Sequence, residues 1–426
     1  MMNTTSSNPV PTDPVLQEFA NSPKGDGPPL PFATRSVQFS EPVAPPQAQI
    51  EHYFQRQNTP LKPEDANEVH RRGLNNIGNT CYLNSAIQAL RYSTGLKNFF
   101  LDGAWEQHRH YDRKGYALLS DFADLVHRLW GDMDTVPERT ITPSTFANTF
   151  VRFAQEYGSD EIVAGAQADA AEAIQILLDG IHTHVAREVQ MNIHGDTSTP
   201  DRAEYTKSLE SWASFFRKEY SDIVNQYYGQ TQTRIQCVAP DCCNTSTNYE
   251  PWAMLKVPSP GGNTPGEPAP TLQKCIAAAF ETEIVEDYTC SKCKKKGTTR
   301  ITHSISRFPR HLILCLKRFT NEGSKIRARI PYNEHHVSLA PHIAWPSLQE
   351  EDDAKYRVVS TIEHHGSTHG GHYAMRARDT VVKDIEGKKV EEKHWFVYDD
   401  SSCYTLSAGG DATPDTYILF LDRLEQ

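Results

Sequence analysis

The sequence has no surplus of basic residues and no long apolar run. Among 426 residues, 43 Lys and Arg stand against 54 Asp and Glu, which gives a formal net charge of -11. Non-specific nucleic-acid binding needs an excess of cations, so this balance argues against it and suits a basic protein partner. A membrane-spanning helix needs about 20 apolar residues. The longest apolar runs here are far shorter, and Leu312–Leu316 is an example. We therefore expect a protein that binds neither nucleic acid nor membrane.

A secretory signal and a disulfide framework are also not indicated. The first residues, MMNTTSSNPVPTD, have neither a basic start nor an apolar stretch, so we expect no signal peptide. Nine cysteines are an odd number, which points to thiols or metal ligands in a reducing compartment. We therefore expect a cytoplasmic or nuclear protein, and no basic cluster distinguishes these two locations.

Residues 1–66 have the composition of a disordered tail. The first 60 residues hold 11 of the 27 prolines, with few aliphatic side chains and no helical or alternating period. Segments such as Pro28–Phe32 and Pro42–Pro46 favour polyproline II or disorder. The alternative is a docking site for a proline-binding or other partner domain. We predict one folded domain over residues 67–426.

In this domain, helical patterns come first and strand patterns follow. Apolar residues recur at helical spacing in segments 81–90, 116–129, 145–157 and 167–184. Beyond residue 224 the strand-like segments are 231–237, 248–257, 300–306, 311–319, 356–364, 372–378, 395–398 and 415–421, with a short helix at 272–280. This order predicts an α+β fold.

A turn rich in Gly and Asn leads directly into the first predicted helix. The stretch GLNNIGNTCYLNSAIQAL, residues 73–90, sets Cys81 at the junction. Thiolate is the nucleophilic form of cysteine, and a helix N-terminus and a nearby imidazolium stabilise it. Asn79 and Thr80 are candidate helix caps, and the side-chain amide of Asn76 could donate to a developing oxyanion. The alternative is that Cys81 is a small buried apolar residue.

A cysteine nucleophile needs an imidazole base and a group that orients this base. His372 begins a strand-like segment directly after Gly370 and Gly371, where an extended substrate could approach the backbone closely. About two dozen residues further on, a second strand ends at Asp399 and Asp400. Antiparallel pairing of the two strands would set Asp399 beside His372.

Two other interpretations of these groups remain open on the residues alone. His364, His365, His369 and His372 lie within nine residues, which is also the pattern of a metal cluster. The paired carboxylates at 399–400 are also what a solvated turn at the end of a strand would contain.

Two cysteine turns have the spacing of zinc knuckles. Cys290 and Cys293 have two residues between them, and Cys237 is followed by Cys242 after four residues or by Cys243 after five. Two such turns about fifty residues apart could supply four thiolates to one structural zinc ion. The shorter gap favours Cys242, so the predicted ligands are Cys237, Cys242, Cys290 and Cys293. The alternatives are unligated thiols or a site that has lost its metal.

The stretch around Cys81 resembles the cysteine box of the ubiquitin-specific proteases, which reads roughly G-L-x-N-x-G-N-T-C-Y-x-N-S. The sequence GHY at 371–373, followed by WFVYDD at 395–400, resembles the histidine box of the same family. The resemblance implies a papain-like cysteine peptidase fold with a helical thumb, β-sheet fingers and a β-sheet palm. These would cover about residues 67–218, 224–305 and 306–426.

The resemblance also implies the site and the reaction. Cys81 would be the nucleophile, His372 the general base and Asp399 its orienting group, with Asn76 and Asp400 near the oxyanion. The implied activity is that of a thiol-dependent deubiquitinase, which cleaves after the C-terminal glycine of ubiquitin through an acyl-enzyme. No catalytic cofactor is implied, and the zinc would be structural.

The segment QADAAEAIQILLD, residues 167–179, resembles a further family segment. The resemblance implies that Asp169 faces the bound ubiquitin tail, and Gly370, Gly371 and Tyr373 complete the expected substrate-binding set. The expected partners are ubiquitin and ubiquitinated proteins, and we expect a monomer. Two alternatives remain: a hydrolase of a ubiquitin-like modifier, and a non-catalytic ubiquitin-binding scaffold of the same fold.

Overall fold

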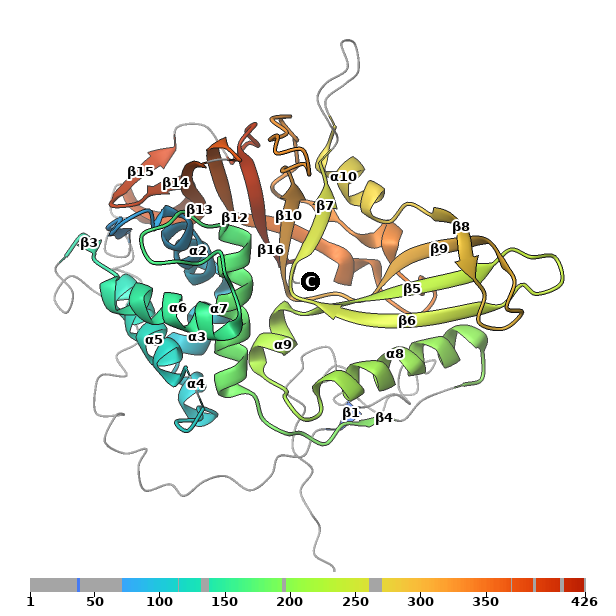
Figure 1. Ribbon diagram of the computed structural model, residues 1–426. Coiled ribbons are helices and arrows are strands. Elements are labelled where there is room, and N and C mark those ends of the chain that lie inside the picture. Colours follow the sequence, from blue (N-terminus) through green and yellow to red (C-terminus); the bar gives the residue numbers. More distant parts are fainter. Residues whose placement is uncertain are drawn as a thin grey trace, which may run out of the picture.

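The computed structural model describes residues 37–38, 71–113, 115–131, 138–193, 197–259, 270–368, 370–385, 388–406 and 410–424. The predicted tail lies outside the described residues, except for β1 (Val37–Gln38), which pairs antiparallel with β4 (Asn192–Ile193). Figure 1 shows helices α2 to α7 gathered in one lobe, a large sheet beside them, and a second sheet that extends away from the lobe, with α8 along this second sheet and α10 beside β7.

The helices occupy the N-terminal half of the described chain, as the sequence predicts. They are α2 (Cys81–Tyr92), α3 (Thr94–Leu101), α4 (Ala104–Gln107), α5 (Tyr116–Trp130), α6 (Ser144–Tyr157), α7 (Ala170–Val185), α8 (Pro200–Phe216) and α9 (Asp222–Tyr227), followed later by α10 (Leu272–Ala279). The predicted helix at 167–184 begins three residues late, because the Asp169 carboxylate caps α7 by accepting the N–H groups of Ala171 and Glu172.

Helix α2 is the central element of the helical lobe. Its side chains from Cys81 to Arg91 are all buried, because α7 packs against one side of the helix and strand β13 (Gly370–Ile385) against another. Other elements therefore surround α2, including its first residue. Cys81 is therefore held between the helices and the larger sheet.

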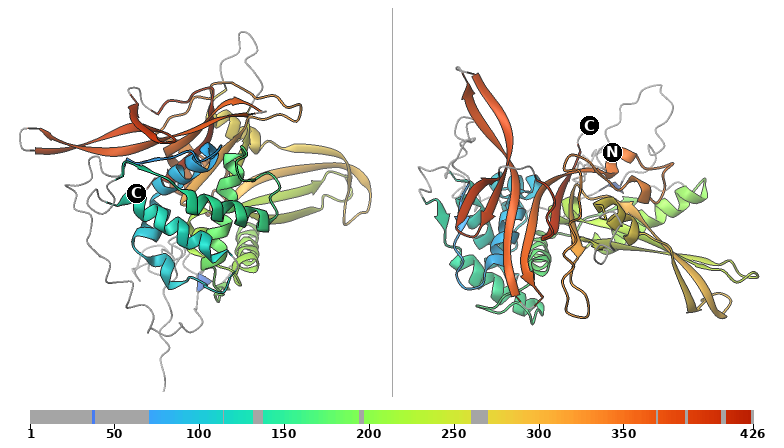
Figure 2. Two further views of the ribbon diagram at one scale, coloured as in Figure 1. Left: turned by 60° about the vertical axis from the view of Figure 1, so that its left-hand side comes forward. Right: turned by 90° about the horizontal axis from the view of Figure 1, so that it is seen from above.

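The larger sheet has eight strands. Its order is β15 (Ser402–Leu406), β14 (Lys388–Asp399), β13, β12 (Lys355–Ser367), β16 (Thr416–Arg423), β10 (His311–Lys317) and β7 (Leu255–Pro258), with β11 (Val337–Ser338) beside β12. Only β10 and β7 are parallel. Beyond the pair Arg378–Trp395, β13 and β14 continue as a two-stranded ribbon, which Figure 2 shows running out past the rest of the sheet.

Both faces of the larger sheet are buried. On β10, Ile313 and Cys315 join the core under the helices, whereas Leu312, Leu314 and Leu316 join a second core on the α10 side. Side chains alternate between the faces of a strand, so a strand covered on both sides is apolar throughout. This explains the unbroken apolar run that the sequence shows here.

The extended sheet has the order β6 (Thr245–Trp252), β5 (Gly229–Cys237), β9 (Lys296–Arg307) and β8 (Glu283–Thr289). The prediction of one strand over 248–257 is wrong. The chain leaves this sheet at Trp252, bends at two buried residues, Ala253 and Met254, and enters the larger sheet at Leu255. The apolar pattern continues through the bend and so conceals it.

The fold is α+β, as predicted, and its three parts correspond to the predicted thumb, palm and fingers. The exact domain boundaries stay a prediction. Within the described ranges, no helix combines the length and the apolar character needed to cross a bilayer.

Candidate active site

A pocket of about 340 Å³ lies where α2, the segment before α7 and the β12–β13 turn meet. Cys81 lines it, together with all four residues expected to bind substrate: Asp169, Gly370, Gly371 and Tyr373. The fold thus brings the predicted nucleophile to residues that lie far away in the sequence.

The predicted base and its orienting carboxylate form a pair beside this pocket. His372 Nε2 lies 2.5 Å from Asp399 Oδ1, and β13 and β14, which carry the two residues, are antiparallel neighbours as predicted. The bond to Asp399 engages Nε2 and leaves Nδ1 as the nitrogen that can serve another group.

The Cys81 thiol is buried, with 4% of the residue exposed. Burial raises the pKa of this thiol and the Asp400 carboxylate adds to the rise, while the backbone N–H groups of Tyr373, Tyr82 and Cys81 act to lower it. Among the described residues, the Cys81 thiol forms no hydrogen bond with the His372 ring. In this structure the Cys81 thiol is therefore separate from the His372–Asp399 pair, and its raised pKa disfavours the thiolate.

The turn before α2 is held by its own side chains. Asn76 Oδ1 accepts the N–H groups of Gly78 and Thr80, both at 3.1 Å. Thr80 is the N-cap residue of α2, as predicted, and Asn79 is not, but the Thr80 side chain accepts no helix N–H. Thr80 Oγ1 instead accepts the N–H of Ile77, and Asn79 Nδ2 donates to the carbonyl of Gly165 at 2.7 Å.

The two groups expected near the oxyanion lie together. Asn76 Nδ2 donates to Asp400 Oδ2 at 2.9 Å, and the other oxygen of Asp400 accepts from Asn84 Nδ2 at 2.8 Å. Asp400 has a φ of +46°, a backbone conformation that non-glycine residues rarely adopt. Sequence reasoning missed Asn84, whose only signal was its place in the CYLNS stretch, three residues after Cys81.

Asp169 is already fully engaged within the chain. Besides capping α7, its carboxylate accepts the hydroxyl groups of Tyr417 at 2.8 Å and Tyr373 at 3.4 Å. These bonds tie the helical lobe to β16 and β13. Its predicted contact with a substrate stays a prediction.

Gln167 is a second residue that sequence reasoning missed as a site residue. Its amide donates to the carbonyl of Gly371 and accepts the N–H of the same residue, both at 3.2 Å. These are the backbone groups that an extended peptide would use if it paired with the start of β13. Gln167 therefore bridges the pocket next to His372.

The alternative of a histidine metal cluster is not supported. His364 and His365 are successive residues of β12 and face opposite sides, so His364 is buried while His365 Nδ1 lies 3.1 Å from Asp415. His369 lies outside the described residues. Among the described residues, His372 groups with Asp399 and Asp400 rather than with other histidines.

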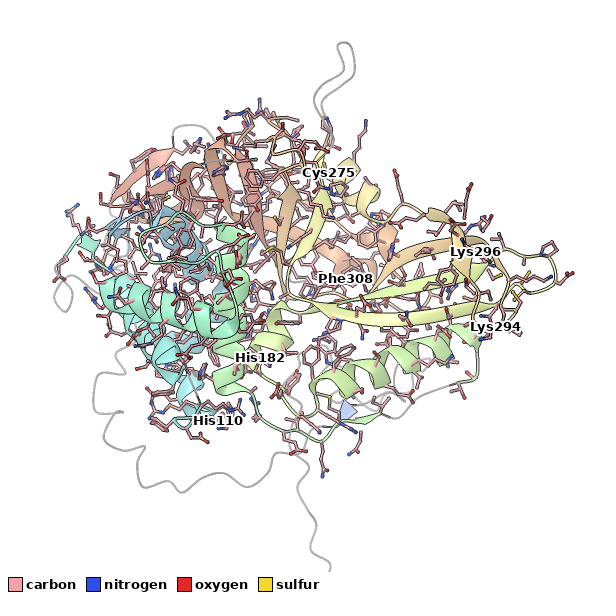
Figure 3. The ribbon with its side chains drawn as sticks, in the orientation of Figure 1. His110, His182, Cys275, Lys294, Lys296 and Phe308 are labelled. Atoms are coloured by element: carbon pink, nitrogen blue, oxygen red, sulfur yellow. The ribbon has the colours of Figure 1, made fainter. Side chains whose placement is uncertain are left out.

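The four predicted zinc ligands come together at the far end of the extended sheet, where Figure 3 labels Lys294 and Lys296. The sulfur atoms of Cys237, Cys242, Cys290 and Cys293 all lie within 4.8 Å of one another. The Cys242 and Cys290 sulfurs are 3.8 Å apart, which is about the edge of a tetrahedron with zinc–sulfur bonds of about 2.3 Å. The cluster therefore fits a zinc ion.

Cys243 is not part of this cluster, as predicted. Its side chain is exposed, and its thiol points at the carbonyl groups of Ala239 and Pro240. In the other turn, the N–H groups of Cys293 and Lys292 lower the pKa of the Cys290 thiol to about 6.

The chain is similar to known ubiquitin carboxyl-terminal hydrolases over most of its length. The sequence profile described as ubiquitin carboxyl-terminal hydrolase matches residues 72–421. Ubiquitin carboxyl-terminal hydrolase 2 of Bos taurus is 28% identical over 357 residues, covering 82% of this chain and 54% of the relative. Ubiquitin carboxyl-terminal hydrolase 4 of Candida glabrata is 28% identical over 417 residues, covering 90% and 44%. The chain spans about half the length of the curated relatives it matches.

Solved structures with the same fold include the SAGA Ubp8/Sgf11/Sus1/Sgf73 DUB module bound to ubiquitin aldehyde. The match has a TM-score of 0.61 and 18% identity, and it covers 88% of this chain and 74% of that chain. A variant of the same module bound to monoubiquitin gives the same values. At this identity the likeness shows the fold alone.

Proposed function

The chain belongs to the ubiquitin carboxyl-terminal hydrolase family, and from this premise we propose that it is a cysteine-type deubiquitinase. One observation carries the proposal: Cys81 and the glycines preceding His372 line one pocket, and His372 is paired with Asp399. A nucleophile, a base with its orienting group and a wall without side chains are what cleavage after a Gly-Gly tail requires.

In this mechanism, the sulfur of Cys81 attacks the carbonyl carbon of the C-terminal glycine of ubiquitin. Nδ1 of His372 takes the thiol proton and returns a proton to the leaving amine, while Asp399 stabilises the imidazolium. The Asn76 amide and the N–H of Cys81 donate to the oxyanion. Water activated by His372 then hydrolyses the thioester, which releases ubiquitin and restores the thiol.

In this structure Cys81 and His372 are not hydrogen-bonded, and the raised pKa of Cys81 disfavours the thiolate that the reaction needs. We propose that substrate in the pocket brings the thiol and the imidazole together. The same observation favours a second candidate, a ubiquitin-binding scaffold without activity. The two differ in whether Cys81 ever forms a covalent bond with the bound tail.

We propose further that the cysteine cluster binds one structural zinc ion. Four thiolates whose sulfur atoms lie within 4.8 Å of one another would close the coordination sphere and leave no position for a reacting water. The zinc would hold the β5–β6 and β8–β9 turns together at the end of the extended sheet.

Ubiquitin and ubiquitinated proteins are the proposed partners. The acidic balance of the chain suits a basic partner surface, and the structural neighbours bound to monoubiquitin and ubiquitin aldehyde support this choice. A monomeric state and a cytoplasmic or nuclear location are proposed on the sequence alone.

A ubiquitin probe with a C-terminal propargyl amide tests the proposal. We expect one covalent adduct with the unaltered chain, observed by mass spectrometry of the intact protein, and none with Cys81→Ala. Cys243→Ser is the matched control, because it removes an exposed thiol outside the pocket and should leave the adduct unchanged. Probes built on ubiquitin-like modifiers identify which modifier is accepted. Binding of ubiquitin without an adduct would establish the scaffold instead.

A further inference from the structure

A buried asparagine on the nucleophile helix contacts the pair of groups expected at the oxyanion. Asn84 lies one turn after Cys81 on α2 and is 2% exposed. Its Nδ2 donates to Asp400 Oδ1 at 2.8 Å and lies 3.3 Å and 3.4 Å from the carbonyl oxygens of Leu74 and Asn75. Three acceptor oxygens around one atom require the N–H₂ group there, so the orientation of this amide is set by its surroundings.

The other end of the Asn84 amide is not satisfied. In the described part of the chain, Asn84 Oδ1 is buried and has no hydrogen-bond partner. An unpaired buried acceptor destabilises the folded state. A leucine of similar shape would avoid this cost, so the asparagine is best explained by what its Nδ2 does.

Asp400 connects Asn84 to Asn76, which lies in the turn before α2. Its two carboxylate oxygens are divided between two amides, Asn84 inside the protein and Asn76 at the surface. Its backbone is fixed as well, because the carbonyl of Asp400 accepts the N–H of Leu74 at 2.8 Å. The carboxylate thus has one orientation in which it accepts a hydrogen bond from both amides.

Asn76 is the end of this chain of contacts. Its Oδ1 is occupied by the N–H groups of Gly78 and Thr80, and one of its two Nδ2 hydrogens is directed at Asp400. Among the described residues, the second Nδ2 hydrogen has no acceptor, so it is the one available to an oxyanion. The direction of this hydrogen depends on Asp400.

From these contacts we infer that Asn84 is a positioning residue for the oxyanion donor. Asn84 holds the Asp400 carboxylate, Asp400 orients the Asn76 amide, and the nucleophile helix and the oxyanion loop are thereby kept in register. The inference rests on the proposed hydrolase function and assigns a role within that reaction. Asn84 itself does not touch the reacting atoms.

The test measures hydrolysis of ubiquitin carrying a C-terminal aminomethylcoumarin by the full chain. Asn84→Leu keeps the side-chain shape and removes the amide. Because an oxyanion donor is worth about 10²–10³ in kcat, we expect kcat to fall about tenfold to a hundredfold, with KM changed less than about twofold. Asn148→Leu is the matched control: it makes the same change at an exposed position of α6, outside the pocket and the contacts of Asn84, and kcat should be unchanged.

The double variant distinguishes positioning from a general structural effect. In an Asn76→Ala background, Asn84→Leu should cost less than about a further twofold in kcat, because residues that act through one group are not additive. Asp400→Asn, an isosteric change in a partly exposed turn, should reproduce the loss and be equally non-additive with Asn76→Ala. It replaces Asn84→Leu if that variant does not fold.

Two results would overturn the inference: an unchanged kcat in Asn84→Leu, or a loss that keeps its full size in the Asn76→Ala background. Both would be seen while the unaltered chain and Asn148→Leu hydrolyse the substrate. Failure of the proposed function is a different result, in which the unaltered chain releases no coumarin.

Discussion

The Cys81 thiol lines the pocket, but it is almost completely buried. Burial and the neighbouring Asp400 carboxylate both raise its pKa, so at neutral pH the thiolate fraction is smaller than in an ordinary cysteine. Thiolate forms as the pH rises through the raised pKa, so the alkylation rate of Cys81 increases with pH.

We predict that iodoacetamide alkylates Cys81 in the unbound chain with a pH midpoint above about 8.5, the ordinary value for a cysteine. Asp400→Asn should move the midpoint down, because it removes a negative charge that opposes the thiolate. The measurement is mass spectrometry of the Cys81 peptide after timed alkylation across a pH series. A midpoint at or below that of free cysteine would contradict the prediction.

His364 carries a second pH dependence, in stability rather than reactivity. Burial and the nearby Lys325 lower the pKa of His364 to about 4, while an unfolded histidine titrates near about 6.5. Between these values the unfolded chain binds more protons than the folded one, so stability falls as the pH falls from about 6.5 to about 4.

We expect this single group to cost about 2 kcal/mol of unfolding free energy between pH 7.5 and pH 5. His364→Gln removes the titration, so the variant should show a flatter pH dependence in urea unfolding than the unaltered chain. His365→Gln is the control, since the neighbouring side chain is half exposed and bonded to Asp415. Equal slopes for His364→Gln and the unaltered chain would show that His364 is not held neutral.

At the scale of elements, substitutions in the two cysteine turns test the proposed zinc site. We predict about one zinc ion per purified chain by elemental analysis, lost in Cys242→Ser and retained in Cys243→Ser, because only the first sulfur lies in the cluster. Removal of the metal by a chelator should also speed hydrogen exchange in β8 and β9, which the turns connect. Equal zinc content in the two variants would mean that Cys242 is not a ligand.

An element can be predicted from the sequence when its own residue pattern determines it, and not when contacts with distant segments do. α2, α5 and α6 follow from apolar spacing alone, and the break between β6 and β7 does not, because it depends on which sheet each half joins. β8 was missed because its residues are mostly exposed and carry no alternating apolar signal.

The same distinction applies to the site. His372 and Asp399 could be paired from sequence, since they lie on consecutive strands joined by one turn. The bonds of Asn84 to Asp400 and of Gln167 to Gly371 join residues 316 and 204 positions apart. Such contacts depend on how α2 packs against the larger sheet and α7 against α2, which no local pattern encodes.

At the scale of the whole molecule, the two cores together extend over nearly the whole described range from residue 71 to residue 424. The core under the helices begins at Leu74, and the second core ends at Leu421. The contribution of the predicted tail within the described residues is the short β1–β4 pair. From its composition, the predicted disordered tail over residues 1–66 is expected to add little to the stability of the folded domain.

We predict that a chain starting at residue 67 folds with a thermal midpoint within about 2 °C of the full chain and forms the same adduct with the ubiquitin probe. Deletion of residues 416–426 is the contrasting variant. It removes β16, which lies between β12 and β10 and places Ile418 and Leu419 in the two cores, and it should prevent cooperative unfolding altogether. Circular dichroism melting compares the three chains. A large loss of stability on removing residues 1–66 would show that the tail is part of the folded domain, and the predicted boundary at residue 67 would have to move toward the N-terminus.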